Sequence, residues 1–410
     1  AYGAKHSFYL VNGSTSGVQS MLLSACRPGD EIIVSRNTHK SLMSGVILSR
    51  TLPIYLKPLM HETLHVLYDL SPAQIEEALR KHPRAKAVFI SRPTYNGVCS
   101  DIKEIARITK KYKKLLLVDE AWGTHLKFHP DFPVSALEAG ADMVVQSIHK
   151  IASAMSQGSV LHVNSAAVDI NWVKKVVSML QSTSPSYVIL ASLDMARKQL
   201  AVEGKIRLTK LLKLLDKASR ELNQIDGVSC LRKEDLLEGY DLDYTKLSIN
   251  CSAIGLSGYE VSKYLTQKYN IQVDCENFYN LIAIAGLGTD EGDLDKLVAA
   301  IRDIAKKYGR KKPLAALPPL SYETEMVMSP AATLGKEIKK IPLKDAVGMI
   351  SAEIFSIYPP GIPVVVPGER ITQEVYEYLK ELNKINIGIK GKENSLSREI
   401  EVVNIKTGKR

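Results

Sequence analysis

The stretch LLLVDEAWGTH, residues 115–125, decides the fold: four apolar residues run into Asp119, and glycine follows four positions later. A short apolar run with polar residues and glycine at its end predicts a buried strand. Runs of the same kind are SFYLVN (7–12), EIIVS (31–35), LPIYLK (52–57), AVFIS (87–91) and DMVVQS (142–147). Apolar residues at helical spacing lie between them, at 18–26, 41–49, 71–82 and 101–112. This alternation predicts an α/β fold with a mostly parallel sheet and helices on both of its faces.

The remaining sequence divides into smaller units. Residues 1–190 form the expected large domain, and 191–226 are expected to be connecting helices because their apolar residues have helical spacing. Apolar runs around a helical pattern at 258–269 predict a small α+β domain at 227–310. A proline-rich linker at 311–329 then leads to a C-terminal domain at 330–410.

Composition limits the class of protein. Of the 410 residues, 45% are hydrophobic and 24% charged, which is typical of folded proteins and excludes wholesale disorder. No apolar run is long enough for a membrane helix, so we expect no membrane partner and a cytoplasmic location. Five scattered cysteines indicate reduced thiols rather than disulfides or structural zinc. The net charge of +10 is not clearly clustered, so we expect no nucleic-acid partner; an RNA-binding relative without catalysis stays a remote alternative.

The residues that follow each predicted strand are the candidates for chemistry, because parallel sheets bind ligands at their carboxyl edge. The GSTSG turn at 13–17 precedes a helix and predicts either a phosphate site or a plain helix cap. Asp119 is either a buried carboxylate that needs a cationic partner or a capping residue. Lys150, close to Ser147 and His149, is either an imine-forming amine or a surface charge.

The order of these features is more specific than any one of them. A phosphate site, an imidazole at His39, an acid at a strand end and a lysine at a strand end are what pyridoxal 5'-phosphate requires. The cofactor needs a lysine to form an imine, a carboxylate to hold its ring nitrogen protonated, and donors for its phosphate. The sequence therefore predicts pyridoxal phosphate as the cofactor and no metal.

At this point the chain resembles the Orn/Lys/Arg decarboxylase family, pyridoxal-phosphate enzymes of fold type I, over essentially all 410 residues. Seven motifs appear in the family's order: NGSTSG (12–17), RNTHKS (36–41), PTYNG (93–97), VDEAWGTH (118–125), SIHK (147–150), STSPSYVILASLD (182–194) and YPPGIPVVVPGE (358–369). The layout looks most like the short biosynthetic arginine decarboxylases. Many of these carry His where this chain has Trp122, and the family has a further N-terminal segment, so we expect the large domain to be truncated.

The resemblance implies roles for single residues. Lys150 would form the imine, Asp119 would pair with the pyridinium nitrogen, and His39 would stack on the ring face opposite Ala121. The phosphate would be held by Thr15, Ser16, Ser147 and His149. Thr183 or Ser184 would reach the phosphate in a neighbouring subunit, so a homodimer or higher homo-oligomer with shared sites is expected. Glu353 would lie near the basic end of the substrate.

The resemblance implies decarboxylation of a basic amino acid, with arginine to agmatine favoured and with lysine to cadaverine or ornithine to putrescine as alternatives. A fold-type-I aminotransferase or lyase is a more remote alternative, since it would use the same lysine and aspartate. The sequence HETLH at 61–65 matches a zinc motif, but prolines at 58 and 72 leave little room for the helix that motif needs, so we interpret it as accidental.

Overall fold

The computed structural model describes residues 1–314, 324–357, 362–384 and 399–404. Its main feature is a seven-stranded sheet in the order β1-β8-β7-β6-β4-β2-β3. Five of the strands form the parallel part: β3 (Leu52–Leu56), β2 (Glu31–Ser35), β4 (Ala87–Ser91), β6 (Leu115–Asp119) and β7 (Met143–Ser147). β8 (Ser159–Val163) runs antiparallel to both β7 and β1 (His6–Leu10). The six predicted strands and the mostly parallel sheet are confirmed.

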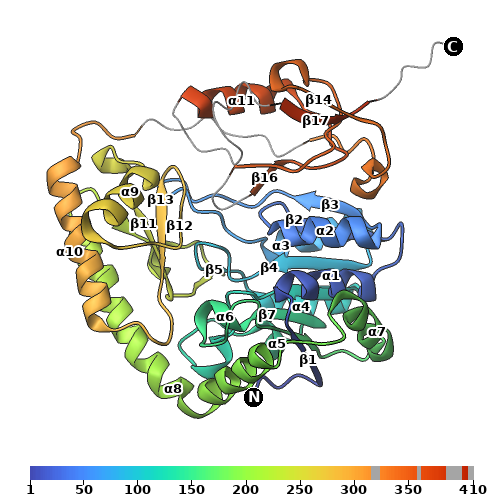
Figure 1. The fold of residues 1–410 in the computed structure, drawn as a ribbon, viewed down its shortest axis with the longest axis horizontal. Coiled ribbons are helices and arrows are strands. Elements are labelled where there is room, and N and C mark those ends of the chain that lie inside the picture. The colour runs from blue at the N-terminus through green and yellow to red at the C-terminus, as the bar shows by residue number, and fades with distance from the viewer. Residues whose placement is uncertain (315–323, 358–361, 385–398, 405–410) are drawn as a thin grey trace.

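Helices cover both faces of this sheet, as predicted (Figure 1). One face packs against α1 (Gly13–Ala25), α2 (Lys40–Ser49) and α7 (Ile170–Leu180). The other packs against α3 (Pro72–Lys81), α4 (Ile102–Lys111), α5 (Ala136–Ala139) and the start of α8 (Tyr187–Asn223). Successive strand residues alternate between the two cores: Val118 belongs to one core and Leu117 to the other. Side chains of a strand point alternately to opposite faces, so continuous apolar runs serve both cores.

Local sequence explains where several helices begin. Ser71 forms a capping box with Gln74 and is followed by Pro72 at the first turn of α3. The Asp101 side chain accepts hydrogen bonds from the backbone N–H groups of Lys103 and Glu104 at the start of α4. Both helices therefore begin where the helical patterns at 71–82 and 101–112 predict.

A single helix of 37 residues, α8 (Tyr187–Asn223), connects the large sheet to a four-stranded antiparallel sheet (Figure 1). This smaller sheet has the order β12-β13-β11-β9, with bounds Cys275–Glu276, Asn280–Ile284, Lys246–Asn250 and Ser229–Cys230. α9 (Gly258–Tyr269), α10 (Glu291–Tyr308) and the second half of α8 share one apolar core with it. A two-residue ladder between β5 (Val98–Cys99) and β10 (Asp241–Leu242) also joins the two parts.

The described part of the C-terminal unit contains two short antiparallel ladders and one α-helix. β14 (Ile338–Pro342) pairs with β17 (Glu399–Val403), and β15 (Phe355–Ile357) pairs with β16 (Ile362–Val365). α11 (Gln373–Lys384) packs on their apolar core. The unit lies beside β2, β3 and α2 in Figure 1. The first four residues of the YPPGIPVVVPGE motif, 358–361, lie outside the described residues.

Among the described residues, no helix is long and apolar enough to cross a bilayer. All five cysteines are free and buried, as expected for reduced thiols.

Candidate active site

A cleft of about 1100 Å³ lies at the carboxyl ends of β2, β4, β6 and β7. The opposite wall is formed by the four-stranded sheet and the first turns of α10. The sheet contributes residues 283–286 and the segment 270–274 that precedes β12. The cleft therefore forms where the strand ends of the large sheet meet the smaller sheet. Of the residues singled out in the sequence, five line it: His39, Asp119, Ala121, His149 and Lys150.

Lys150 follows β7 in the four-residue helix α6 (Ile148–Ile151) and points into the cleft. Burial lowers the pKa of its amine, although the carboxylate of Asp119 acts in the opposite direction. A lysine whose amine loses its proton more easily is a better nucleophile at neutral pH. The position suits an amine that reacts with a carbonyl group.

Asp119 ends β6 and is 8% exposed. Its Oδ1 accepts a hydrogen bond from the Ala121 backbone N–H at 3.0 Å, and among the described residues Oδ2 has no hydrogen-bond partner. Burial raises the pKa of this carboxyl group, against the opposing effects of Lys150 and His39. A buried carboxylate with one unfilled oxygen fits a ligand that carries a protonated ring nitrogen.

His39 is the N-cap residue of α2. Its Nδ1 accepts from the Ser41 backbone N–H at 3.2 Å and lies 2.9 Å from Ser41 Oγ, so the ring orientation is fixed by the helix start. Burial lowers the pKa of the imidazole. A neutral aromatic ring in this wall can pack against a flat ligand.

The start of α1 has no side-chain cap, because Asn12 makes no capping hydrogen bond. Ser14 lines the cleft, and Ser147 Oγ donates to Ser14 Oγ at 2.9 Å. The Ser16 hydroxyl is buried and donates to the Gly13 carbonyl at 2.8 Å, while Thr15 is exposed and is not among the cleft residues. The structure thus presents Ser14, which the sequence did not single out, as the cleft-lining hydroxyl of the motif. Uncapped N–H groups with a hydroxyl pair form an anion site.

Gly17, the second glycine of the NGSTSG motif, allows α1 to approach the sheet closely. A Cβ atom there would lie 2.4 Å from Val145 Cγ2 and 2.8 Å from Leu10 Cδ1. Any side chain would push the helix start away from β7, so the glycine is needed for packing.

Three residues with roles implied by the family lie elsewhere. Thr183 and Ser184 are exposed, just before α8, and are not among the cleft residues. Glu353 lies in the C-terminal unit, where its Oε1 accepts from the Glu401 backbone N–H at 2.9 Å. Within one chain, therefore, the structure does not bring these three side chains to the cleft.

The sequence also missed contacts made by Trp122. Lys150 Nζ lies 4.0 Å from the centroid of the Trp122 ring, and Tyr95 packs edge-on against that ring at 5.7 Å. The Tyr95 hydroxyl in turn donates to Asp274 Oδ2 at 2.5 Å, which joins the large sheet to the small one. Tyr95 lies in the PTYNG motif, after the apolar run 87–91, and Asp274 follows the mostly apolar run 271–273. Both residues could have been found by the criterion applied to the others, which was a position after an apolar run.

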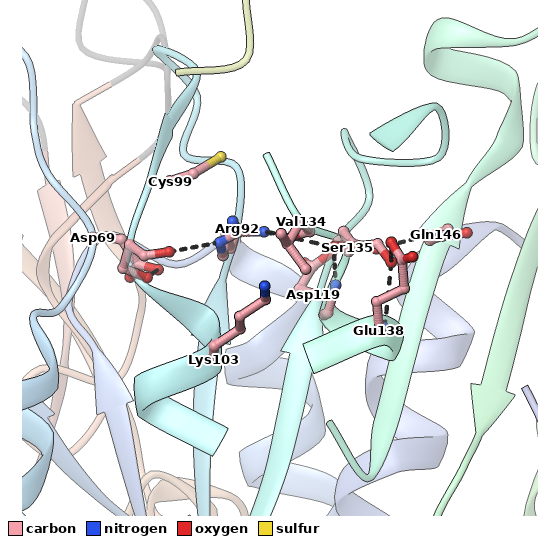
Figure 2. Close-up of polar contacts among 12 residues, drawn as sticks. Asp69, Arg92, Cys99, Lys103, Asp119, Val134, Ser135, Glu138 and Gln146 are labelled. Carbon is pink, nitrogen blue, oxygen red and sulfur yellow. Dashed lines mark hydrogen bonds and ion pairs between the residues drawn. The ribbon is translucent and has the colours of Figure 1, made fainter. Parts of the chain in front are cut away.

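A buried polar network lies next to Asp119 (Figure 2). Arg92 Nη1 donates to the Val134 carbonyl at 2.7 Å and lies 3.9 Å from Glu120 Oε1, and Arg92 Nε donates to the Ser100 carbonyl at 3.0 Å. Ser100 Oγ donates to Asp69 Oδ2 at 3.1 Å. The positive charge of Arg92 therefore acts on two fully buried carboxyl groups, those of Asp69 and Glu120. Burial raises the pKa of both Asp69 and Glu120 to about 7.

Glu120 is also fixed from the other side. Its Oε1 accepts from the Ala136 backbone N–H at 2.7 Å, and its Oε2 accepts from Gln146 Nε2 at 2.6 Å. Glu120 therefore connects the loop after β6 with strand β7. Asp119 is the last residue of β6, and Lys150 lies three residues after the end of β7.

The HETLH segment does not form the helix its zinc motif requires. It is a turn in which His61 Nε2 lies 2.9 Å from the Asp235 carbonyl, while His65 has a φ of 51° and stacks on Tyr279. Throughout the described ranges, no group of three or more His, Cys, Asp or Glu side chains is placed to hold a metal ion.

These residues fit pyridoxal phosphate by their own chemistry. Lys150 offers an amine of lowered pKa, Asp119 an unfilled carboxylate oxygen, and the α1 start with Ser14 and Ser147 an anion site. An imine-forming amine, a partner for a ring nitrogen and a phosphate site are the three requirements of this cofactor.

Comparison with known proteins agrees with this geometry. The major domain of Orn/Lys/Arg decarboxylases matches residues 1–293, and the C-terminal domain of the same enzymes matches 319–397. An arginine decarboxylase of Bacillus subtilis is 37% identical in an alignment that covers 98% of this chain and 83% of that protein. A lysine decarboxylase of Pseudomonas aeruginosa is 23% identical, over 92% of this chain and 65% of that protein. The crystal structure of a Francisella novicida lysine decarboxylase superposes with a TM-score of 0.81 at 21% identity, covering 98% of this chain and 70% of the other.

Proposed function

Because the chain belongs to the Orn/Lys/Arg decarboxylase family, we propose that it is a pyridoxal-phosphate-dependent decarboxylase that converts L-arginine to agmatine and carbon dioxide. The observation that carries the proposal is that Lys150 and Asp119 line one cleft with an uncapped helix start. Arginine is favoured over lysine because the relatives named arginine decarboxylase are more similar to this chain than those named lysine decarboxylase.

Each cleft residue has a task in this reaction. When bound, pyridoxal phosphate supplies the electron sink that accepts the electron pair left by the departing carbon dioxide. Asp119 would keep the ring nitrogen of the cofactor protonated, and Ser14, Ser147 and His149 would bind its phosphate. His39 and Ala121 would pack against its ring. Lys150 would hold the cofactor through its amine, whose lowered pKa favours the unprotonated form, and a protonated Lys150 or His39 would donate a proton to the substrate's α-carbon.

The test is product identification. The purified chain is mixed with pyridoxal phosphate and with arginine, lysine or ornithine in separate reactions, and the amine is identified by mass spectrometry. We expect agmatine from arginine. Cadaverine or putrescine would redirect the assignment to lysine or ornithine, and a keto acid would indicate an aminotransferase. No product from any of the three would remove the decarboxylase assignment.

A matched pair of lysine variants links the activity to the cleft. Lys150→Ala should lose both turnover and the visible absorbance of the bound cofactor. Lys103→Ala removes an exposed lysine of α4 and should retain both. Full turnover by Lys150→Ala would contradict the role given to Lys150.

We further propose that two copies share their active sites, with Thr183 or Ser184 of one copy at the phosphate site of the other. The exposed Thr183 and Ser184 directly precede an apolar surface on α8, where Tyr187 is 82% and Met195 71% exposed. Exposed apolar surface of this kind marks association sites. A mixture of inactive Lys150→Ala chains with Thr183→Ala/Ser184→Ala chains should recover activity, because a mixed dimer contains one intact site. Failure to recover activity in a verified mixed dimer would exclude sharing.

A further inference from the structure

Lys246 is a buried lysine that the proposed reaction does not use. It begins β11, and its side chain and that of Asp243 are both 0% exposed. Lys246 Nζ lies 2.6 Å from Asp243 Oδ2. Removing two charges from water is costly, and such pairs seldom add net stability over apolar residues. The pair therefore calls for an explanation other than stability.

Asp243 is held in one position by several donors. His125 Nε2 lies 3.0 Å from Asp243 Oδ1, and the Thr245 hydroxyl and backbone N–H donate to the same oxygen at 2.7 and 3.1 Å. Burial alone would raise the pKa of Asp243, but Lys246 and His125 together hold it below its usual range. The carboxylate stays ionised, and it holds the amine of Lys246 in position.

The fixed ammonium group of Lys246 shares a partner with Lys150. Lys246 Nζ lies 5.3 Å from the centroid of the Trp122 ring, and Lys150 Nζ lies 4.0 Å from the same centroid. Cations are attracted to the face of an indole ring at such distances. Trp122 thus has two lysine amines near its ring, one from the strand end of β7 and one from the small sheet.

The charge of Lys246 also acts on Lys150. In the described part of the chain, the titratable groups that face Lys150 are Asp119, Asp274, His39 and Lys246. The two carboxylates favour a proton on Lys150, whereas Lys246, like burial, lowers the pKa of Lys150. A neighbouring cation is a known way to activate an amine for reaction with a carbonyl group.

We propose that Lys246, fixed by Asp243, is a positioning residue for Lys150: its ammonium group opposes a second positive charge at Lys150 Nζ and holds the Trp122 ring beside it. The inference rests on the proposed role of Lys150 as the cofactor-binding amine. The inference predicts that Lys150 reacts readily with an acylating reagent only when position 246 carries a cation. This holds whether or not the cation also stabilises the fold.

The test measures the reactivity of the Lys150 amine directly. The full chain, before cofactor is added, is treated with an acylating reagent at a series of pH values, and labelling of Lys150 is followed by mass spectrometry with exposed Lys103 as internal reference. In Asp243→Asn/Lys246→Met both members of the pair become neutral, so no buried charge is left alone and the fold should persist. We expect Lys150 labelling at neutral pH to fall roughly tenfold and its profile to move to higher pH. Lys246→Arg, which keeps the cation, should restore much of the labelling.

A second readout reports on Trp122. The chain has two tryptophans, so Trp172→Phe leaves Trp122 as the only indole. In that background the double substitution should change the Trp122 emission, because a nearby cation is removed.

Unchanged Lys150 labelling in a folded double variant would overturn the inference. The outcome is separable from the proposed function: normal arginine decarboxylation with unchanged labelling defeats only the role of Lys246. If the parent protein has no decarboxylase activity, the proposed function is wrong, but the labelling result still tests the effect of Lys246 on Lys150.

Discussion

Arg36 and Glu369, 333 positions apart in the chain, form a buried two-point ion pair, with Nη1 2.5 Å from Oε1 and Nη2 2.7 Å from Oε2. Arg36 Nη2 also donates to the Val364 carbonyl at 2.9 Å, and Glu369 Oε2 accepts from the Val366 backbone N–H at 2.9 Å. Arg36 lies three residues before His39 in the loop that lines the cleft. The C-terminal unit is therefore attached to the loop that carries His39.

Breaking this pair should be costly. Arg36→Met leaves the Glu369 carboxylate buried without its cation, so we expect the free energy of unfolding to fall by about 3–5 kcal/mol in urea titrations. Arg36→Met/Glu369→Leu removes both charges and should recover most of the loss. The neighbouring Arg370–Glu325 pair is exposed and is the matched control: Arg370→Met should cost much less. Equal losses from the two arginine variants would contradict a special role for the buried pair.

Ser14 should contribute more to cofactor binding than Thr15 does. Ser14→Ala removes the cleft-lining hydroxyl that accepts from Ser147, and a lost hydrogen bond to a phosphate should raise the Kd of pyridoxal phosphate about tenfold to a hundredfold. The Kd is measured by the change in tryptophan emission on titration with the cofactor. Thr15→Ala, at the exposed neighbouring position, should leave the Kd within about twofold. The reverse ranking would return the role to Thr15.

Much of the fold was predictable because the signals were local. Each strand of the large sheet that the sequence predicted is an apolar run bounded by turn residues, and α2, α3 and α4 between them have capped starts. β8, the run SVLHV, was missed, although the helix α7 follows it as helices follow the parallel strands. Lys150, Asp119 and His39 were predictable since parallel strands end at one edge of the sheet.

The rest of the site depends on contacts between distant segments. Asp243 and Lys246 reach the cleft wall through His125 and Trp122, more than 100 positions away in the chain. No periodicity predicts such a meeting, although two charged residues at the start of an apolar strand are a signal of a buried pair. Ser14 and Ser16 could not be ranked from the motif alone, because only the helix geometry decides which hydroxyl turns inward.

Gly17 should not tolerate a methyl group. Gly17→Ala would place Cβ against Val145 and Leu10 at distances that no packing accepts, so we expect a loss of about 1–3 kcal/mol in the free energy of unfolding. The Kd for pyridoxal phosphate should rise as well, because the α1 start moves. Gly45→Ala in α2, where the nearest atoms would lie 3.5 Å away, is the control and should stabilise by up to about 1 kcal/mol. Thermal and urea unfolding with cofactor titration distinguish the two variants, and equal behaviour would contradict the packing argument.

Glu120 should make stability depend on pH in an unusual direction. Its pKa is raised from 4.5 to about 7 in the folded protein, so the folded state holds its proton more tightly than the unfolded state does. The stabilising contribution is complete below pH 4.5 and is lost as the pH rises to about 7, a change of about 3 kcal/mol. Glu120→Gln cannot ionise and lacks this change.

The difference in unfolding free energy between Glu120→Gln and the parent protein should therefore increase by about 3 kcal/mol between pH 4.5 and pH 8, measured by urea unfolding across that range. Taking the difference at two pH values cancels the fixed cost of altering the bonds to Ala136 and Gln146. Exposed Glu104, whose pKa is lowered by the hydrogen bond from Arg107, is the control. Its Gln variant should show a small change of the opposite sign, because that carboxylate stabilises the fold only when ionised. A pH-independent difference for Glu120→Gln would mean that Arg92 keeps Glu120 ionised at every pH tested. In that case Asp69 would be the carboxyl group of this network whose pKa is raised.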